Sequence, residues 1–142
     1  MLGIQEAVNV IGMMPADTPK RVLIADDAAG ARDLVCSILR PSGYEVFEAK
    51  DGEEAIACAT RLQPDLVILD LQMPKLDGCS VASKLRNMES FENTPILALS
   101  AWMSQMDPED LAQAGFSKCL SKPISPSKLR SMVSELFAAS RA

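Results

Sequence analysis

The chain has 142 residues, of which 48% are hydrophobic and 23% charged, as in an ordinary globular domain. Its net charge of −5 argues against a nucleic-acid-binding module, and no apolar run approaches the ~20 residues of a membrane span. It has no histidine, and its four cysteines form no CxxC pair, which favours free thiols in a reducing cytosol over a zinc site.

Residues 1–19 are predicted to form an extension ahead of one domain that spans residues 20–142. Apolar residues between positions 4 and 11 fit one face of a helix, but a glycine and two prolines then interrupt the pattern. We interpret the segment as a mobile or weakly helical tail, with a short amphipathic docking segment as the alternative. A signal peptide is not indicated, because a basic start is missing and Glu6 interrupts the apolar residues.

From residue 21 onward, five short apolar stretches alternate with five helical patterns. The predicted strands are Arg21–Ala25, Tyr44–Ala49, Leu66–Leu69, Pro95–Ser100 and a short strand within Phe116–Ser121. The predicted helices are Ala28–Arg40, Gly52–Leu62, Cys79–Met88, one from Pro108 to Gly115 and a closing helix that starts at Pro126. Residues 89–94 are predicted to be a polar loop.

Local signals support these boundaries. The run Leu66–Leu69 has no polar alternation, which is typical of a strand buried on both faces of a parallel sheet. Asp51, Asp107 and Ser125 each precede a predicted helix as N-cap residues, and proline follows the last two. Strands alternating with helices in this way predict an α/β fold, with a parallel sheet covered by helices on both faces.

Polar side chains stand at the ends of four predicted strands. Asp26 and Asp27 follow the first strand, Asp70 the third and Lys122 the fifth, while Ser100 ends the fourth. In a parallel sheet these ends share one edge, where open α/β folds bind their ligands. Clustered carboxylates repel one another unless a cation is present. Mg²⁺ suits such a cluster, because it takes oxygen ligands from one or two carboxylates and a phosphate.

Lys122 and Ser100 would add a positive charge and a hydroxyl donor to this cluster. Magnesium, lysine and a hydroxyl are the groups that phosphoryl transfer needs around its equatorial oxygens. Asp70 is then the candidate nucleophile, which would form an aspartyl phosphate. Because the chain has no histidine, any phosphohistidine donor would belong to a partner.

Each of these residues also has a structural interpretation when taken alone. Asp70 suits a helix cap or a turn, and the pair Asp26–Asp27 suits a helix N-cap. Serine commonly ends a strand, as Ser100 does, and Lys122 before a proline suits a solvated position. We favour the functional interpretation because all of them fall at strand ends of one repeated pattern.

Five segments together resemble the receiver domain of bacterial two-component response regulators, of the stand-alone, single-domain type. They are Val22–Asp27 (VLIADD), Gly43–Ala55, Pro64–Gly78 (PDLVILDLQMPKLDG), Pro95–Ala101 (PILALSA) and Ala114–Ser125 (AGFSKCLSKPIS). The resemblance spans about residues 21–137. It implies a flavodoxin-like (βα)5 doubly wound parallel sheet with strand order 2-1-3-4-5.

The resemblance also implies roles for the acids. Asp70 would be the phosphoacceptor. Asp27 would bind Mg²⁺ directly, together with Asp70 and the main-chain carbonyl of Gln72. Asp26 would act mainly through a metal-bound water.

Further roles follow from the resemblance for the residues around the phosphoryl group. Ser100 would hydrogen-bond that group and move with it, while Lys122 would pair with it. The Lys122–Pro123 peptide bond would be cis, which is uncommon for X-Pro bonds. Ala101 is small, as is usual in the family, and would leave room for the phosphoryl group.

Two residues set this chain apart. The family usually carries Tyr or Phe where this chain has Cys119, so we expect the conformational switch to work differently, or barely, at this position. Trp102 lies two residues past Ser100. We expect its bulk to hinder the attacking water and to slow loss of the phosphoryl group.

The resemblance implies a histidine kinase or histidine phosphotransfer protein as the phosphoryl donor. A downstream target would bind the face made by the fourth helix, fifth strand and fifth helix. We expect no DNA binding and no enzymatic activity beyond Mg²⁺-dependent self-phosphorylation and autodephosphorylation. Because few residues follow Phe137, we expect a single-domain protein of the cytoplasm.

Three alternatives stay open. In the first alternative, the chain is a receiver fragment of a hybrid histidine kinase or of a longer regulator. In the second it is a phosphatase with an aspartate nucleophile, which usually has a second acid two residues past that nucleophile, where this chain has Gln72. The third is a flavin or nucleotide binder, which the acidic loop at residues 26–30 disfavours because it would repel a phosphate.

Overall fold

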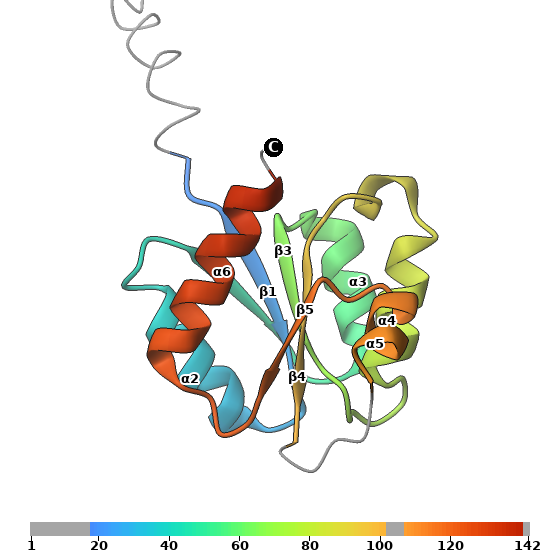
Figure 1. Ribbon diagram of the computed structural model, residues 1–142, viewed down its shortest axis with the longest axis horizontal. Coiled ribbons are helices and arrows are strands. Elements are labelled where there is room, and N and C mark those ends of the chain that lie inside the picture. Colours follow the sequence, from blue (N-terminus) through green and yellow to red (C-terminus); the bar gives the residue numbers. More distant parts are fainter. Residues whose placement is uncertain (1–17, 102–106, 141–142) are drawn as a thin grey trace, which may run out of the picture.

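The computed structural model describes residues 18–101 and 107–140 (Figure 1). Nearly all of the predicted N-terminal extension, and Trp102 with its predicted effect on dephosphorylation, lie outside the described residues. Within them, no helix is long and apolar enough to cross a membrane.

Five parallel strands form one sheet in the order β2-β1-β3-β4-β5, which confirms the predicted topology. The strands are β1 (Arg21–Ala25), β2 (Glu45–Ala49), β3 (Leu66–Asp70), β4 (Ile96–Ser100) and β5 (Lys118–Ser121). Their register aligns the carboxyl ends: Ala25 lies beside Ala49 and Leu69, and Ser100 lies beside Ser121. Residues that follow these strands therefore meet at one edge of the sheet.

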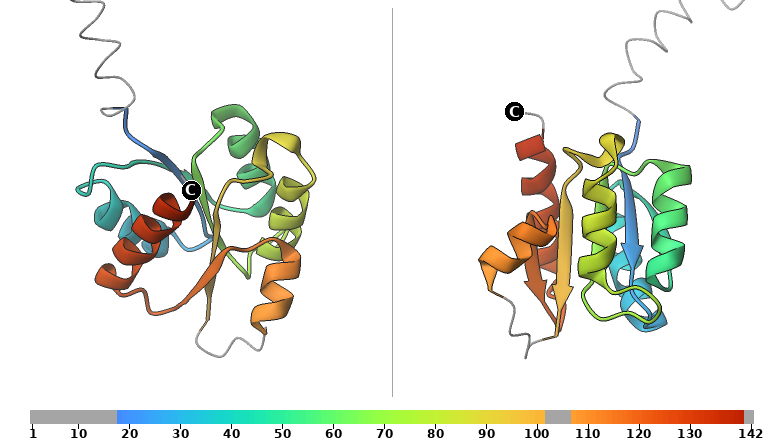
Figure 2. Two further views of the ribbon diagram at one scale, coloured as in Figure 1. Left: turned by 45° about the horizontal axis from the view of Figure 1, so that its top comes forward. Right: turned by 90° about the vertical axis from the view of Figure 1, so that its right-hand side faces the viewer.

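Helices cover both faces of the sheet. They are α2 (Ala29–Leu39), α3 (Gly52–Leu62), α4 (Gly78–Arg86), α5 (Pro108–Ala114) and α6 (Pro126–Ser140), with a short 3-10 helix η1 (Glu89–Phe91). Helices α2 and α6 pack on one face, and α3, α4 and α5 lie on the other (Figures 1 and 2). The alternating pattern correctly predicts helices on both faces of a parallel sheet, and the doubly wound, flavodoxin-like arrangement is the one that the resemblance implies.

Alternate strand residues divide the core into two layers. Along β1, Val22 and Ile24 face α2 and α6, whereas Leu23 and Ala25 face the other three helices. All five residues of the central strand β3 are buried, as the continuous apolar run predicts. This two-sided burial makes the sheet a rigid support for the side chains at its edge.

The helix starts largely follow the predicted caps. The Asp51 carboxylate accepts the backbone N–H of Glu54 at 2.8 Å at the start of α3, and Ser125 receives the N–H of Lys128 at 3.4 Å in α6. Asp107 occupies the N-cap position of α5, but its side chain makes no capping hydrogen bond, which corrects the expectation for this residue. The proline at the first position of α5 still fixes the backbone there.

The segment predicted to be a polar loop differs from the expectation. It contains η1, whose Phe91 is 1% exposed and fills the core beside α4. The Arg86 guanidinium donates to the carbonyl oxygens of Phe91 at 2.6 Å and Gly115 at 3.0 Å, which ties this segment to the end of α5. A single aromatic residue among polar neighbours gives no periodic signal, so sequence pattern alone did not indicate this packing.

Candidate functional site

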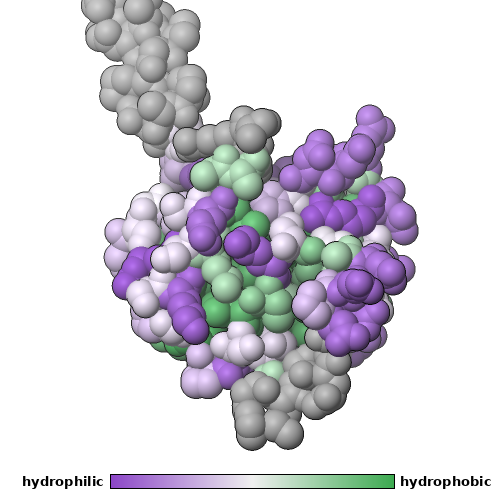
Figure 3. Space-filling model, viewed as in Figure 1, coloured by the Kyte–Doolittle hydropathy of each residue, from purple (hydrophilic) through white to green (hydrophobic). Residues whose placement is uncertain are grey.

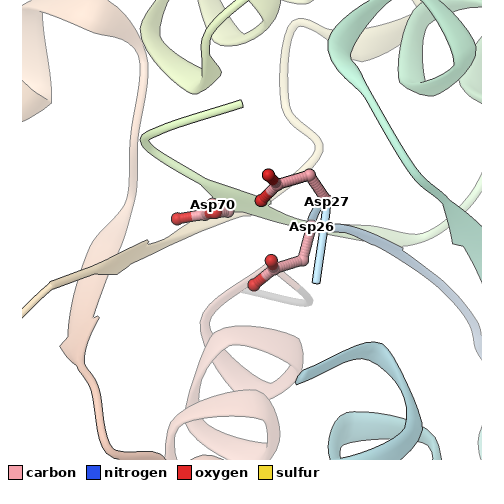
Figure 4. Close-up of side chains that lie close together, drawn as sticks. All are labelled: Asp26, Asp27 and Asp70. Atoms are coloured by element: carbon pink, nitrogen blue, oxygen red, sulfur yellow. The ribbon is translucent and has the colours of Figure 1, made fainter. Parts of the chain in front are cut away.

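Three carboxylates converge at the carboxyl edge of the sheet. Asp26 and Asp27 directly follow β1, and Asp70 is the last residue of β3. One carboxylate oxygen from each lies within 4.8 Å of the others (Figure 4). Asp26 is fully buried and Asp70 is 5% exposed, whereas Asp27 is open to solvent. The predicted acid cluster therefore forms, with two buried members and one accessible one.

Asp26 is fixed by bonds from several elements. Its Oδ2 accepts a hydrogen bond from Lys122 Nζ at 2.8 Å, and its Oδ1 accepts the backbone N–H of Ala28 at 3.0 Å. The N-cap residue of α2 is Ala28, which offers no side-chain cap. The acid pair consequently does not serve as the helix cap that was its structural alternative.

Lys122 lies between two of the acids. Its Nζ is 2.8 Å from Asp26 Oδ2 and 3.7 Å from Asp70 Oδ2, and 29% of the side chain is exposed. Burial opposes the charge on this ammonium group, but the hydrogen bond to Asp26 and the attraction of both carboxylates outweigh it and raise the lysine pKa. Lys122 therefore stays charged and offsets part of the negative charge of the cluster.

The strand ends hold this lysine in place. The backbone N–H of Lys122 donates to the carbonyl oxygen of Ser100 at 2.7 Å, which extends the pairing of β5 with β4. The Lys122–Pro123 peptide bond is cis, the geometry that the resemblance implies.

The environment of Asp70 disfavours its ionised form. Its burial, followed by the negative charge of Asp26, raises the pKa of Asp70 from 3.8 to about 6, although Lys122 acts in the opposite direction. The geometry agrees with this direction, because the carboxylate is nearly buried beside a second acid. A cation at the cluster would offset this negative charge and favour the ionised form of Asp70.

The predicted hydroxyl is also at the site edge. Ser100 ends β4 and is 3% exposed. The thiol of Cys119 donates to Ser100 Oγ at 3.5 Å, so the resting hydroxyl is in contact with β5. Ala101 follows it on the exposed side. Gln72 is exposed, and its backbone N–H lies 3.4 Å from Asp70 Oδ1, whereas the predicted use of its carbonyl as a metal ligand stays a prediction.

The turn after β3 leaves no room for a side chain at Gly78. A Cβ atom at this position would overlap the carbonyl oxygen of Asp70 and lie 3.0 Å from the Cα of Leu71. The N–H of Gly78 donates to the Leu71 carbonyl at 3.1 Å, so α4 begins in direct contact with the end of β3. The sequence motif includes this glycine, but its packing role became visible only in the structure.

The donor set fits a magnesium ion. Magnesium prefers oxygen ligands and usually combines one or two carboxylates with water molecules. Here three carboxylates lie within reach of one ion, and Lys122 is the one cation among the described residues that forms ion pairs with two of them. Asp26, Asp27 and Asp70 together form the candidate site for this ion.

Comparison with known proteins identifies the class to which this fold and site belong. Residues 22–134 match the family described as the response regulator receiver domain. The match covers well over half of the chain, and the chain therefore belongs to the response regulator receiver domain family. Its acidic cluster is the phosphoacceptor and magnesium site of such a domain.

Individual relatives share this domain in different settings. The DNA-binding dual master transcriptional regulator RpaA of Synechocystis sp. is 38% identical over 117 residues, which are 82% of this chain and 48% of RpaA. The chain thus spans about half the length of that regulator. The polar-differentiation response regulator DivK of Brucella anthropi is 33% identical over 107 residues, which are 75% of this chain and 87% of DivK.

A solved structure supports the metal assignment. The receiver domain of the sensor histidine kinase PA1611 from Pseudomonas aeruginosa PAO1 aligns with a TM-score of 0.78 at 30% identity. The alignment covers 85% of this chain and 99% of that domain, which was crystallised with a magnesium ion coordinated in its active site cleft. The same fold with a related sequence therefore holds magnesium in the corresponding cleft.

Proposed function

We propose that this chain receives a phosphoryl group from a phosphohistidine of a histidine kinase or histidine phosphotransfer protein. The observation that carries the proposal is the cluster of Asp26, Asp27 and Asp70 with Lys122 at the carboxyl edge of the sheet. An Asp70 carboxylate oxygen attacks phosphorus, the P–N bond breaks, and its electron pair returns to the partner's imidazole. The product is an aspartyl phosphate on Asp70.

The surrounding residues have separate roles in this transfer. Lys122, held by Asp26, supplies a fixed positive charge beside the attacking carboxylate. Ser100 leaves its contact with Cys119 and donates its hydroxyl hydrogen to the transferred group. Asp27, Asp70 and the Gln72 carbonyl would hold magnesium, and Asp26 would act on it through water. The ion, when bound, neutralises charge that develops on the phosphoryl oxygens.

The output surface proposed here is the face formed by α5, β5 and α6. A groove of about 480 Å³ between β5 and α6 is lined by residues that include Cys119, Leu120 and Met132. Figure 3 shows apolar surface gathered in the middle of this face. Because Cys119 touches both Ser100 and the groove, movement of Ser100 would alter the surface that a target protein meets. Phosphorylation should then shift backbone amide NMR signals along β5 and α6 more than those along α3.

The chain's own chemistry is limited to gain and loss of this phosphoryl group. Its relatives include both a longer DNA-binding regulator and DivK, of which it covers 87%, so the module can serve either as a single domain or within a longer protein. All four cysteines are free, which suits the reducing cytosol where such a relay would operate.

Incubation with acetyl phosphate and Mg²⁺, followed by intact-mass measurement, tests the central proposal. The wild type should gain the mass of one phosphoryl group, and Asp70→Asn should gain none. Asp110→Asn, which changes an exposed acid on α5, is the matched control and should be phosphorylated like the wild type. No adduct on the wild type with acetyl phosphate or with a phosphorylated histidine partner would refute the proposed function.

A further inference from the structure

Arg32 lies outside the site formed by the three acids and Lys122, but its side chain contacts that site. The residue lies one helical turn after the start of α2. One of its terminal nitrogens donates to the main-chain carbonyl oxygen of Asp26 at 2.8 Å. Its Nε donates to Glu48 Oε1, near the end of β2, at 3.1 Å, and 18% of the side chain is exposed. The guanidinium group therefore joins α2, the end of β1 and β2.

We propose that Arg32 is a positioning residue for the metal site, and this inference rests on the proposed function of that site. The carbonyl that Arg32 binds belongs to the peptide unit between Asp26 and Asp27. Holding this carbonyl fixes the orientation of the peptide plane that leads into Asp27. The Asp27 side chain is exposed, so the direction in which its carboxylate points depends on the backbone that carries it.

The other contacts at this turn act on Asp26 itself. Its N–H donates to the Ala49 carbonyl at 3.1 Å, and its carboxylate is bound by Ala28 and Lys122. Arg32 completes this set on the side that faces Asp27. The planar fork of a guanidinium group can serve two acceptors at a fixed angle, which a lysine ammonium on a flexible stem cannot do. Glu48 anchors that fork and keeps it aimed at the carbonyl.

The positive charge of Arg32, considered alone, should weaken the binding of a divalent cation. Arg32 is a cation near the acids, so removing it without further change would strengthen the attraction of a divalent cation. Its ion pair with Glu48 offers a way to separate charge from geometry. Replacing both partners by neutral residues leaves the net charge unchanged and removes the guanidinium group together with its hydrogen bonds to Asp26 and Glu48.

Magnesium affinity of the unphosphorylated full-length chain tests the inference by isothermal titration calorimetry. The double variant Arg32→Met with Glu48→Gln should bind Mg²⁺ roughly tenfold more weakly than the wild type, the effect of losing a group that orients metal ligands. Arg32→Lys, which keeps the charge, should fall between the two. The control pair Arg130→Met with Glu109→Gln, on exposed parts of α6 and α5, should stay within about twofold of the wild type.

The outcomes separate this inference from the proposed function. If the wild type binds no Mg²⁺, the metal site itself fails. If it binds and the charge-neutral double variant binds equally or more tightly, Arg32 does not position the acids, even if the variant melts at a lower temperature. Should that variant not fold cooperatively, Arg32→Lys decides, and an affinity equal to that of the wild type overturns the inference.

Discussion

The carboxylate of Asp70 is held in a place where ionisation is unfavourable. It is nearly buried, lies within a cluster of three acids, and has Lys122 at 3.7 Å as a partial counter-charge. Native proteins commonly retain such unfavourable arrangements at functional sites, where the groups are needed for chemistry rather than for stability. Removing the negative charge of Asp70 should therefore increase the free energy of unfolding.

Asp70→Asn should stabilise the protein at neutral pH in the absence of divalent cations. The pKa of Asp70 rises on folding from 3.8 to about 6, because of burial and then the charge of Asp26. The folded state thus holds the proton more tightly, and this contribution, complete below pH 4, is lost as the pH rises through about 6. Asparagine does not titrate, so the variant should be more stable by roughly 1–2 kcal/mol at pH 7.5, allowing for solvent screening.

Urea unfolding in EDTA at pH 4 and pH 7.5 measures this difference directly. The two proteins should have nearly the same free energy of unfolding at pH 4 and should diverge above it. Asp110→Asn, exposed on α5, controls for the general effect of removing one negative charge. If the difference in free energy of unfolding between the wild type and Asp70→Asn did not change with pH, the pKa of Asp70 would not be raised on folding.

At the scale of elements, the junction between β3 and α4 ties Asp70 to a helix. Gly78 opens α4, and its N–H binds the Leu71 carbonyl while its Cα lies against the main chain of Asp70. The Asp77 carboxylate caps the same helix by accepting the N–H of Ser80 at 2.8 Å. A change at this helix start is therefore transmitted to the end of β3.

Gly78→Ala should destabilise the protein although alanine is the better helix former. The added methyl group would overlap the Asp70 carbonyl oxygen, and relief of that overlap should cost roughly 1–3 kcal/mol. Gly30→Ala is the matched control, because Gly30 lies in α2 with no atom within 4 Å of the added group. That control should be stabilised by roughly 0.5–1 kcal/mol. Thermal unfolding of both variants checks the opposite signs, and equal shifts would show that the junction tolerates a side chain.

The alternation of strand and helix patterns predicted the elements well, because these depend on local sequence pattern. It also predicted at which edge of the sheet the site lies, because that depends on the topology. Asp26, Asp70 and Lys122 were expected at one edge, since the ends of parallel strands must meet there. The closer approach of Lys122 to Asp26 than to Asp70 was not predictable, because it depends on how side chains pack between strands. The contact of Arg32 with Asp26 was missed too, although its position one turn into the helix after the acid pair was a usable signal.

At the scale of the whole molecule, the site combines residues from the central strands β1 and β3 with a lysine that follows an outermost strand, β5. Asp26 and Asp27 follow β1 and Asp70 ends the neighbouring strand β3, while Lys122 follows β5. Two apolar layers cover the two faces of these strands. A ligand that contacts acids from β1 and β3 should therefore stabilise the entire fold.

Magnesium should raise the melting temperature of the wild type. At a free concentration ten times its dissociation constant, a ligand that binds only the folded state adds about 1.4 kcal/mol. For a domain of this size that corresponds to a shift of roughly 3–5 °C. Differential scanning calorimetry with increasing MgCl₂, compared with NaCl of equal ionic strength, measures it. The Asp27→Asn variant should respond much less, and a wild type that responded no more to MgCl₂ than to NaCl would exclude a metal site in the acid cluster.

The ion pair between Asp26 and Lys122 links residues that are 96 positions apart in the chain. During synthesis on the ribosome, β1, β2, β3 and β4 emerge before the strand that carries this lysine. A nascent chain that has reached only β4 already holds all three acids but lacks the ammonium group that binds the most buried of them. The charge balance of the acid cluster is therefore completed late in translation, when β5 joins the sheet and Lys122 comes to lie beside Asp26.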